Sequence, residues 1–172
     1  MSGRSRQVCS VDVPSPRPEA LAGEPRISLQ GHERGASVAP TTIDVRFYEL
    51  DPYGHVNHGV YLNYFEVARI DLLDAIGFGL PRLRELGFHL LVVEAHVRFR
   101  APALAGDRLE VRSQLGALKR ASATWLQEIH RGETLIATNE VRSAITDDSG
   151  RPIKAPPELT EALLALQHAT EH

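Results

Sequence analysis

The chain has 172 residues, the size of one ordinary domain of about 100–200 residues, and its 42% hydrophobic and 24% charged residues are typical of a folded globular protein. A formal net charge of −3 gives no sign of a general binder of nucleic acids or anionic membranes, and no apolar run approaches the roughly 18–20 residues of a membrane span. The single cysteine excludes an intrachain disulfide, and the basic N-terminus has no apolar segment behind it that would indicate a secretory signal, so a cytoplasmic protein fits best.

Residues 1–40 differ in composition from the rest of the chain. Prolines and glycines interrupt every potential periodic run, and aromatic residues are absent. Such a segment cannot bury enough apolar surface to offset the entropy lost on ordering. We therefore predict a disordered N-terminal extension over residues 1–40, for which the sequence indicates no function, and a folded domain over residues 41–172.

The folded part is predicted to open with a strand and a polar loop. Ile43, Val45 and Phe47 alternate with Asp44 and other polar positions, which is the period of a half-buried strand. A polar loop that contains glycines follows over residues 51–59.

The period then becomes helical, with apolar residues spaced three and four apart. This pattern predicts a helix over about residues 60–76, roughly 25 Å long and so able to cross a sheet. Asn57 or His58 lies near the expected N-cap, and Gly77 fits the expected stop signal.

The remainder of the chain is predicted to form four consecutive strands and a short final helix. The alternating runs cover residues 91–99, 109–115, 123–129 and 135–145, and the amphipathic helix covers residues 159–166. One long helix with a run of antiparallel strands indicates an α+β fold in which the helix packs on one face of the sheet.

The loop over residues 51–59 carries the residues that point to chemistry. Asp51 ends the first strand, and a helix N-terminus opens a few residues later, which could put a carboxylate and unpaired backbone N–H groups around one small volume. Asp51 could then attack an acyl carbon or activate a water, and a thiol leaving group would need little acid catalysis. An Asp before a proline also caps turns very commonly, so spacing alone leaves both interpretations open.

The segment over residues 45–69, VRFYELDPYGHVNHGVYLNYFEVAR, resembles the hotdog thioesterases of the 4-hydroxybenzoyl-CoA thioesterase family, including the long-chain acyl-CoA branch and the plant acyl-ACP thioesterases. The family pattern is an Asp-x-x-Gly-His-Val-Asn-Asn-like loop, then Tyr-x-x-Phe-x-Glu-x-Ala-Arg on a central helix. The matching positions are Asp51, Gly54, His55, Val56, Asn57, Tyr61, Phe65, Glu66, Ala68 and Arg69. The likeness covers about residues 42–160, and His58 stands where many relatives have a second Asn.

The resemblance implies a hotdog fold, in which an antiparallel sheet of about five strands wraps around the long helix. It also implies a homodimer or homotetramer that joins its sheets, with the active site at the subunit interface. The catalytic carboxylate maps onto Asp51, and the donors to the thioester oxygen onto the backbone N–H groups of His58, Gly59, Val60 and Tyr61. Whether Asp51 is the nucleophile or a general base stays open. No cofactor is expected, because coenzyme A is part of the substrate.

Each of the other candidate residues has a purely structural interpretation as well as a functional one. Glu66 could be a second catalytic carboxylate, or it could pair with Arg69 or Arg46 or brace the loop. The histidines lack the further ligands of a typical metal site, so no metal is expected. Tyr53, His55 and Asn57 are candidate substrate contacts. The cations that could bind coenzyme A phosphates or an acidic carrier protein, or simply be solvated, are Arg98, Arg100, Lys119 and Arg120.

The sequence therefore predicts a hydrolase that cleaves an acyl-CoA to free acid and CoA. Release of an acyl or polyketide chain from a carrier protein is the alternative within this class. From other classes, a non-catalytic hotdog acyl-binding module would be expected to have lost Asp51, and a dehydratase-like enzyme would carry a histidine motif that this chain lacks. A long acyl chain would need an apolar tunnel, for which suitable but equally core-like residues are Leu72, Leu73, Ile76, Phe78 and Leu83.

Overall fold

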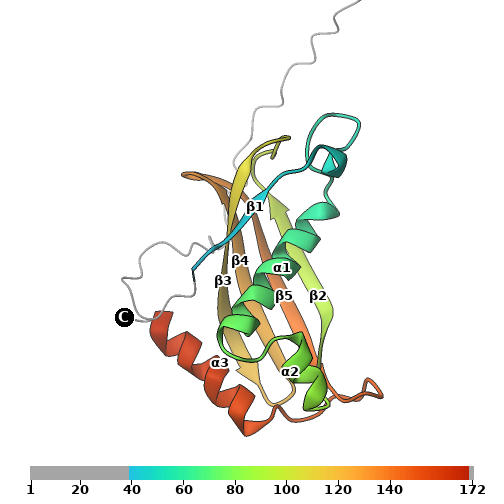
Figure 1. Cartoon of the computed structure of the whole chain (residues 1–172), viewed down its shortest axis with the longest axis vertical. Helices are drawn as coiled ribbons and strands as arrows, with labels where there is room; N and C mark the ends of the chain where they lie inside the picture. The colour runs from blue at the N-terminus through green and yellow to red at the C-terminus, as the bar shows by residue number, and fades with distance from the viewer. Residues whose placement is uncertain (1–38, 171–172) are drawn as a thin grey trace, which may run out of the picture.

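A five-stranded antiparallel sheet curves around one long helix in the computed structural model, which describes residues 39–170 (Figure 1). The predicted disordered extension lies almost wholly outside the described residues. The elements are β1 (Thr41–Asp44), α1 (Val60–Ala75), α2 (Leu80–Glu85), β2 (His89–Phe99), β3 (Arg108–Lys119), β4 (Ser122–Arg131), β5 (Thr134–Thr146) and α3 (Pro157–Thr170). The predicted α+β architecture is confirmed.

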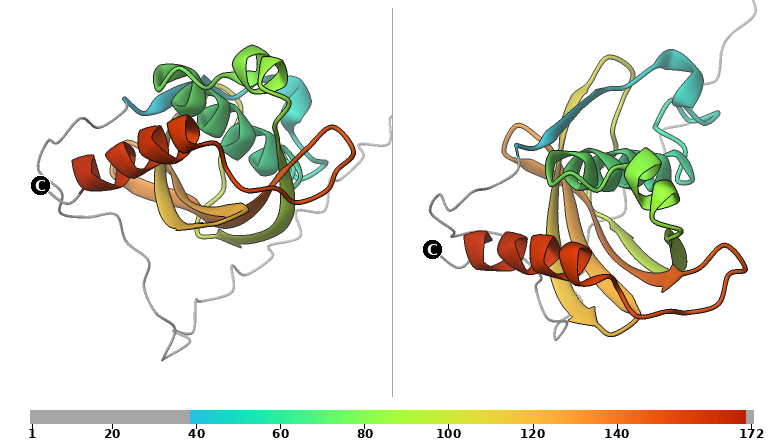
Figure 2. Two further views of the ribbon diagram at one scale, coloured as in Figure 1. Left: turned by 90° about the horizontal axis from the view of Figure 1, so that it is seen from below. Right: turned by 60° about the horizontal axis from the view of Figure 1, so that its bottom comes forward.

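The strands follow the order β1-β3-β4-β5-β2, and every neighbouring pair is antiparallel. The central strands β3, β4 and β5 place alternate side chains against α1, among them the fully buried Trp125 and Ile129. Figure 2 shows the curved sheet enclosing α1 on one side, with α3 beside the end of the sheet where α1 stops. The strands β1 and β2 form the two edges.

Helix α1 begins and ends close to the predicted bounds of about 60–76, and only its N-cap residue differs from the prediction. Gly77 has a φ of +80°, and the backbone N–H groups of Gly77 and Phe78 donate to the carbonyls of Asp74 (3.0 Å) and Leu73 (2.8 Å). This is a Schellman motif, which favours glycine because other residues rarely adopt positive φ. The N-cap position is Gly59 instead of Asn57 or His58.

The first strand, α2 and α3 differ from the predictions. The first strand stops at Asp44, and Phe47, expected on its buried face, is 81% exposed in a 3₁₀ turn over residues 47–49. The carboxylate of Glu49 stabilises that turn by accepting the Arg46 backbone N–H at 2.7 Å. Helix α2 was not predicted, and α3 is longer than the expected range of 159–166. Both helices gain from packing Leu83 and Leu159 into the core, which local pattern does not reveal.

Strand β2 has apolar side chains exposed on both faces, although its alternation predicts one buried face. Leu91, Val92 and Val93 are each about half exposed, and so is Phe99. The cause is its position, because β2 pairs with β5 on one side and has no partner strand on the other among the described residues.

The apolar interior is split into two clusters by a buried polar layer beneath α1. The Gln127 side chain, 1% exposed, donates to the Phe65 carbonyl (2.8 Å) and the Ser113 hydroxyl (2.8 Å), and it accepts from Arg69 (2.9 Å). The residues proposed for a tunnel lie in the cluster beyond this layer, where Leu72, Leu73 and Leu83 are core residues and Ile76 and Phe78 pack against them. None of the helices within residues 39–170 is long and apolar enough to cross a bilayer.

Candidate active site

Asp51 caps a tight turn with one oxygen of its carboxylate. Its Oδ1 accepts the backbone N–H groups of Tyr53 (2.9 Å) and His55 (3.3 Å), two and four residues ahead. The Gly54 N–H donates to the Asp51 carbonyl (3.0 Å) at a φ of +81°, and the Asp51 N–H donates to the His55 carbonyl (2.7 Å). The turn-capping role that an Asp-Pro sequence suggests is therefore present, and no described residue donates to Oδ2.

The same turn recurs at Asp147, which shows what capping alone requires. Oδ1 of Asp147 accepts the N–H groups of Ser149 (2.9 Å) and Arg151 (3.0 Å), again two and four residues ahead. Gly150 has a φ of +78° and donates to the Asp147 carbonyl at 2.9 Å, as Gly54 does to that of Asp51. The two turns differ in surroundings, since the turn at Asp51 borders a cavity and is followed by the start of a long helix.

Backbone pairing fixes the Asp51 turn against the rest of the molecule. Leu50 and Val56 form an antiparallel bridge across its base, and the Val56 N–H donates to the Ala103 carbonyl at 2.9 Å. On the other side, the Tyr64 hydroxyl of α1 donates to the Glu49 carboxylate at 2.7 Å. Burial and the neighbouring Glu49 raise the pKa of Tyr64, so this phenol stays protonated and keeps donating at neutral pH.

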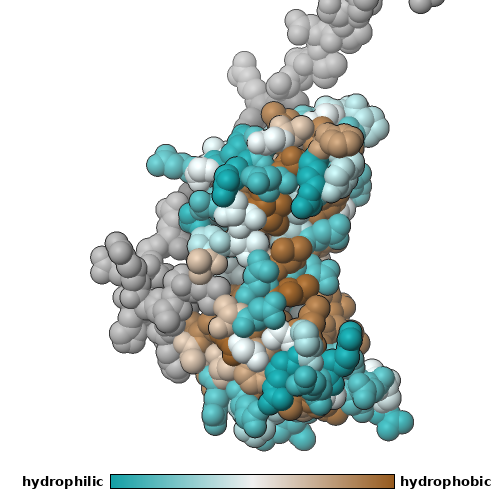
Figure 3. All heavy atoms as spheres, viewed as in Figure 1, coloured by the Kyte–Doolittle hydropathy of each residue, from teal (hydrophilic) through white to brown (hydrophobic). Residues whose placement is uncertain are grey.

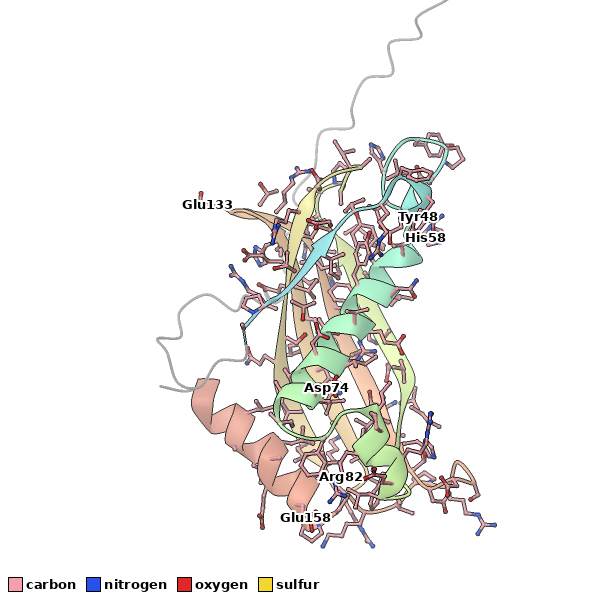
Figure 4. The ribbon with its side chains drawn as sticks, in the orientation of Figure 1. Tyr48, His58, Asp74, Arg82, Glu133 and Glu158 are labelled. Carbon is pink, nitrogen blue, oxygen red and sulfur yellow. The ribbon has the colours of Figure 1, made fainter. Side chains whose placement is uncertain are left out.

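The start of α1 leaves two backbone donors available beside this turn. The side-chain oxygen of Asn57 accepts the Gly59 N–H (2.9 Å), and its carbonyl accepts the Val60 N–H (2.9 Å). Among the described residues, nothing accepts the backbone N–H of His58 or Tyr61. Of the four donors that the family resemblance implies, the fold thus occupies the middle two and leaves the outer two for a ligand. Figure 4 labels His58 at this end of α1, far from Asp74 near its other end.

A cavity of about 340 Å³ joins the turn, the helix start and the end of β2. Its lining residues are Asp51, His55, Val56, His58, Tyr61, Phe99, Arg100, Ala101 and Pro102. The ring of Tyr61 meets that of Phe99 edge to face with centroids 5.1 Å apart, and its hydroxyl accepts the Ala103 N–H at 3.2 Å. Burial raises the pKa of Tyr61, so this wall is a neutral phenol at pH 7.

Five of the residues predicted from the sequence line this cavity together, namely Asp51, His55, His58, Tyr61 and Arg100. Asn57 braces the loop and is not among the lining residues. Tyr53 is 84% exposed and is not among the lining residues either.

The other predicted contacts lie elsewhere in the chain. The strand pairing puts Arg98 on the outer face of the sheet, beside Thr138 and away from α1. Lys119 is the last residue of β3 and Arg120 follows it in the β3–β4 turn, at the end of the sheet near α2 and α3. The Arg120 carbonyl accepts the Ala155 N–H there. Within one chain these three cations are not part of the Asp51 cavity.

Glu66 is exposed on α1 and lines a second cavity. The ion pairs predicted for it are not present among the described residues, because Arg69 donates to Gln127 and Arg46 pairs with Glu49. Glu66 and Asp51 therefore do not share one cavity in a single chain.

Sequence reasoning missed the wall formed by Phe99, Ala101 and Pro102, and the brace between Glu49 and Tyr64. Their positions depend on β2 pairing with β5, which brings the end of β2 against α1. No local signal marks them. Within residues 39–170, no group of three or more His, Cys, Asp or Glu side chains could hold a metal ion.

The chain matches the model of the thioesterase-like superfamily over residues 45–163, which is more than half of its length. It is 38% identical over 90 residues to the long-chain acyl-CoA thioesterase FadM of Escherichia coli, covering 52% of this chain and 67% of that protein. It is 25% identical over 131 residues to the acyl-acyl carrier protein thioesterase ATL3 of Arabidopsis thaliana, covering 74% and 68% of the two chains.

A solved structure of a thioesterase from Thermus thermophilus, complexed with coenzyme A and zinc, matches with a TM-score of 0.67 and 31% identity over 76% of this chain and 94% of that one. The matching core is the antiparallel sheet around a central helix that the sequence predicted. The chain therefore has the hotdog fold, belongs to the thioesterase-like superfamily and is a thioester hydrolase.

Proposed function

We propose that the protein hydrolyses an acyl-CoA to the free acid and CoA in the cavity that contains Asp51. In the first route, a carboxylate oxygen of Asp51 attacks the thioester carbon, the carbon–sulfur bond breaks, CoA leaves as a thiolate, and water then hydrolyses the mixed anhydride. In the second route, Asp51 takes a proton from a water whose oxygen attacks the same carbon. Both routes use only the substrate, water and this chain's own residues.

The observation that carries the proposal is the cavity where the Asp51 carboxylate, whose Oδ2 accepts no hydrogen bond within residues 39–170, meets the start of α1. No described residue accepts the N–H groups of His58 and Tyr61, and they lie where a helix N-terminus favours negative charge, so they can stabilise the oxyanion that forms on attack. A thiolate leaves readily, which fits a site whose Tyr61 phenol is held neutral and is not needed as a strong acid.

Coenzyme A is the favoured carrier of the acyl group. FadM acts on acyl-CoA, the Thermus structure contains coenzyme A, and Arg100 in the cavity could bind a phosphate. ATL3 acts on acyl carrier proteins, and the Lys119–Arg120 turn could bind an acidic protein surface, so carrier-protein thioesters are the second candidate.

We further propose a homodimer in which the β2 edges of two copies pair. Leu91, Val92 and Val93 expose apolar surface on a strand whose outer edge has no partner among the described residues. Exposed apolar edge strands pair with other strands, and antiparallel pairing with a second copy about a two-fold axis satisfies the edge of each.

The direct test is release of free thiol from a panel of acyl-CoA thioesters of increasing chain length, with benzoyl-CoA included. Wild type should turn over at least one of them, and Asp51→Asn should lower kcat/KM about a hundredfold or more. The substitution keeps an Oδ1 acceptor for the turn, so the fold should be unchanged by circular dichroism.

Asp147→Asn is the matched control, because it makes the same change in a turn with the same backbone hydrogen bonds. It should retain wild-type rates. Equal activity of wild type and Asp51→Asn would contradict the role of Asp51 and direct attention to Glu66. If no CoA ester is hydrolysed but acyl carrier protein thioesters are, the substrate is the carrier-protein thioester. If neither kind of thioester is hydrolysed, an acyl-binding module is favoured.

A further inference from the structure

The side-chain hydroxyl of Tyr61 carries a proton that the fold does not use. Its oxygen accepts the Ala103 backbone N–H at 3.2 Å, and the residue is only 3% exposed. Within residues 39–170, no group accepts the proton of this hydroxyl. Tyr64, three residues further along α1 and equally buried, instead donates its proton to Glu49 at 2.7 Å. Because a buried donor without an acceptor is costly, the Tyr61 proton points to a ligand.

The contact with Ala103 places this hydroxyl on the side of the cavity formed by the Asp51 turn. The Ala103 carbonyl accepts the Val56 N–H at 2.9 Å, at the base of that turn. Tyr61 and Asp51 line the same cavity of about 340 Å³. Burial is the main cause of the raised pKa of Tyr61, and the charge of Asp51 raises it further. The hydroxyl therefore lies within electrostatic reach of the carboxylate and keeps its proton at neutral pH.

The ring of Tyr61 is fixed, so its hydroxyl has little choice of direction. Phe99 packs edge to face against it with centroids 5.1 Å apart, and the Tyr64 ring lies 6.2 Å away at 62°. A phenolic O–H stays close to the plane of its ring, and the Ala103 N–H occupies one of the two in-plane directions at the oxygen. The other direction is left for the proton and for the group that accepts it.

A water molecule fits between the Tyr61 hydroxyl and the Asp51 carboxylate. No hydrogen bond joins these two side chains in the described part of the chain, although both line the cavity. A water there would accept from the hydroxyl and donate to Oδ2 of Asp51, which satisfies both groups. Water can enter, because His55, His58 and Arg100 on the cavity wall are exposed. Figure 3 shows hydrophilic side chains beside apolar ones on the surface at the end where α1 begins.

We propose that the Tyr61 hydroxyl holds the water that attacks the thioester, and that Asp51 acts on this water as a general base. The water accepts a hydrogen bond from Tyr61, gives a proton to Oδ2 of Asp51 and bonds to the thioester carbon through its other lone pair. The backbone N–H groups of His58 and Tyr61 stabilise the oxyanion. As the carbonyl re-forms, the carbon–sulfur bond breaks and the proton on Asp51 passes to the departing thiolate. Tyr61 keeps its own proton, and this role rests on the proposed function, of which it selects the general-base route.

Competition between water and hydroxylamine tests the role of Tyr61. Hydroxylamine is a stronger nucleophile than water and depends less on a base, so the hydroxamate product reports substrate binding and oxyanion stabilisation, whereas the acid product reports the held water. Tyr61→Phe should lower acid formation about 10- to 100-fold and hydroxamate formation about threefold or less, after subtraction of the uncatalysed reaction. KM should change little, because the hydroxyl contacts water and not the substrate. Equal losses of the two products would overturn the proposal.

Two other tyrosines provide the comparison. Tyr48→Phe removes a hydroxyl from a residue that is 65% exposed and outside the cavity, and it should keep wild-type rates of both products. Tyr64→Phe removes the other buried hydroxyl, which braces the loop through Glu49, and should lower both products together. If Tyr61→Phe forms acid as fast as wild type and Tyr48→Phe, the role of Tyr61 is wrong and the proposed thioesterase activity stands. Inactivity of wild type would contradict the proposed function and this inference with it.

The first turnover separates attack by the held water from formation of an Asp51 anhydride. If the water attacks the thioester directly, Tyr61→Phe slows the first release of thiol as much as it slows acid formation. A first turnover in which the variant releases thiol at the wild-type rate, while acid appears late, would show the anhydride and overturn the proposal.

A difluorotyrosine in place of Tyr61 tests the same role while the ring and hydroxyl stay in position. Fluorine makes the phenol more acidic, so the hydroxyl loses its proton at a lower pH than in wild type, and a phenolate cannot donate to the water. Acid formation should therefore decline at a lower pH than in wild type, whereas hydroxamate formation should not. The other charged and titratable groups around this phenol are identical in the two proteins, namely Asp51, His55, His58, Arg100, Asp107 and Arg131. Coincident pH profiles of acid formation would contradict the proposal.

Discussion

Asp51 and Asp147 cap two turns with the same pattern of backbone hydrogen bonds, and Asp147 also accepts the Ser149 hydroxyl at 2.7 Å. Each carboxylate caps N–H groups two and four residues ahead, and each turn closes on a glycine with positive φ. Capping therefore explains why an aspartate is tolerated at both positions and does not explain reactivity. Asp51 borders a cavity beside two backbone N–H groups that nothing in the described part of the chain accepts.

Asp107 provides a pH-dependent clamp on the segment that closes this cavity. Its Oδ2 accepts the Leu104 N–H (2.8 Å) and Arg131 Nη1 (2.6 Å). Burial pushes the pKa of Asp107 upward, but the Leu104 and Arg131 hydrogen bonds outweigh it and the pKa is lowered overall. A lowered folded-state pKa means that the stabilisation is complete above the unfolded value near 3.9 and is lost as the pH falls below it.

Asp107→Asn should therefore destabilise the protein by about 1 kcal/mol at pH 7, and the difference from wild type should shrink below about pH 4. Urea unfolding at pH 7, 5 and 3.5 measures this. Asp44→Asn, which changes an exposed carboxylate on β1, serves as the control and should change stability little at any pH. A difference for Asp107→Asn that stays constant down to pH 3.5 would contradict the clamp.

At the scale of elements, buried hydrogen bonds of Gln127 hold α1 over the sheet inside an apolar interior. Gln127 on β4 bonds to the Phe65 carbonyl and to Arg69 on α1, and also to Ser113 on β3. This layer lies between the cluster that supports the Asp51 cavity and the cluster that contains Leu73. Because a buried polar group must find partners, the layer fixes how far α1 can slide or rotate, and so fixes both cavities.

Gln127→Leu should lower the free energy of unfolding by about 2 kcal/mol, because it leaves buried polar partners unsatisfied, among them the charged Arg69. Gln114→Leu makes the same change on the outer face of the sheet and should have a small effect. Urea unfolding of the two variants gives the comparison. Equal losses of unfolding free energy in the two variants would show that the buried hydrogen bonds of Gln127 do not stabilise the fold.

At the scale of the whole molecule, the β2 edge exposes apolar side chains that a second copy could cover. Its exposed apolar side chains and its unpaired edge are explained together if a second copy covers them.

A Leu91→Glu, Val93→Glu double variant should convert the dimer into a monomer, because charges on an edge strand oppose pairing. Sedimentation velocity measures the state, and thiol release should fall with it. Leu164→Glu on the partly exposed face of α3 is the control and should stay dimeric. A wild-type monomer, or a double variant that remains a dimer, would contradict pairing through β2.

The sequence by itself determined the fold class, the extent of α1, the turn at Asp51 and the family. These follow from local physics: the period of apolar residues sets strand or helix, Gly77 supplies the positive φ that ends α1, and the Asp-Pro-Tyr-Gly segment caps itself. Only the tertiary structure decided which residues share a cavity. It brought Phe99 and Arg100 to Asp51 and put Arg98, Lys119 and Arg120 elsewhere, because the strand pairing and the edge position of β2 arise from contacts between segments distant in the chain.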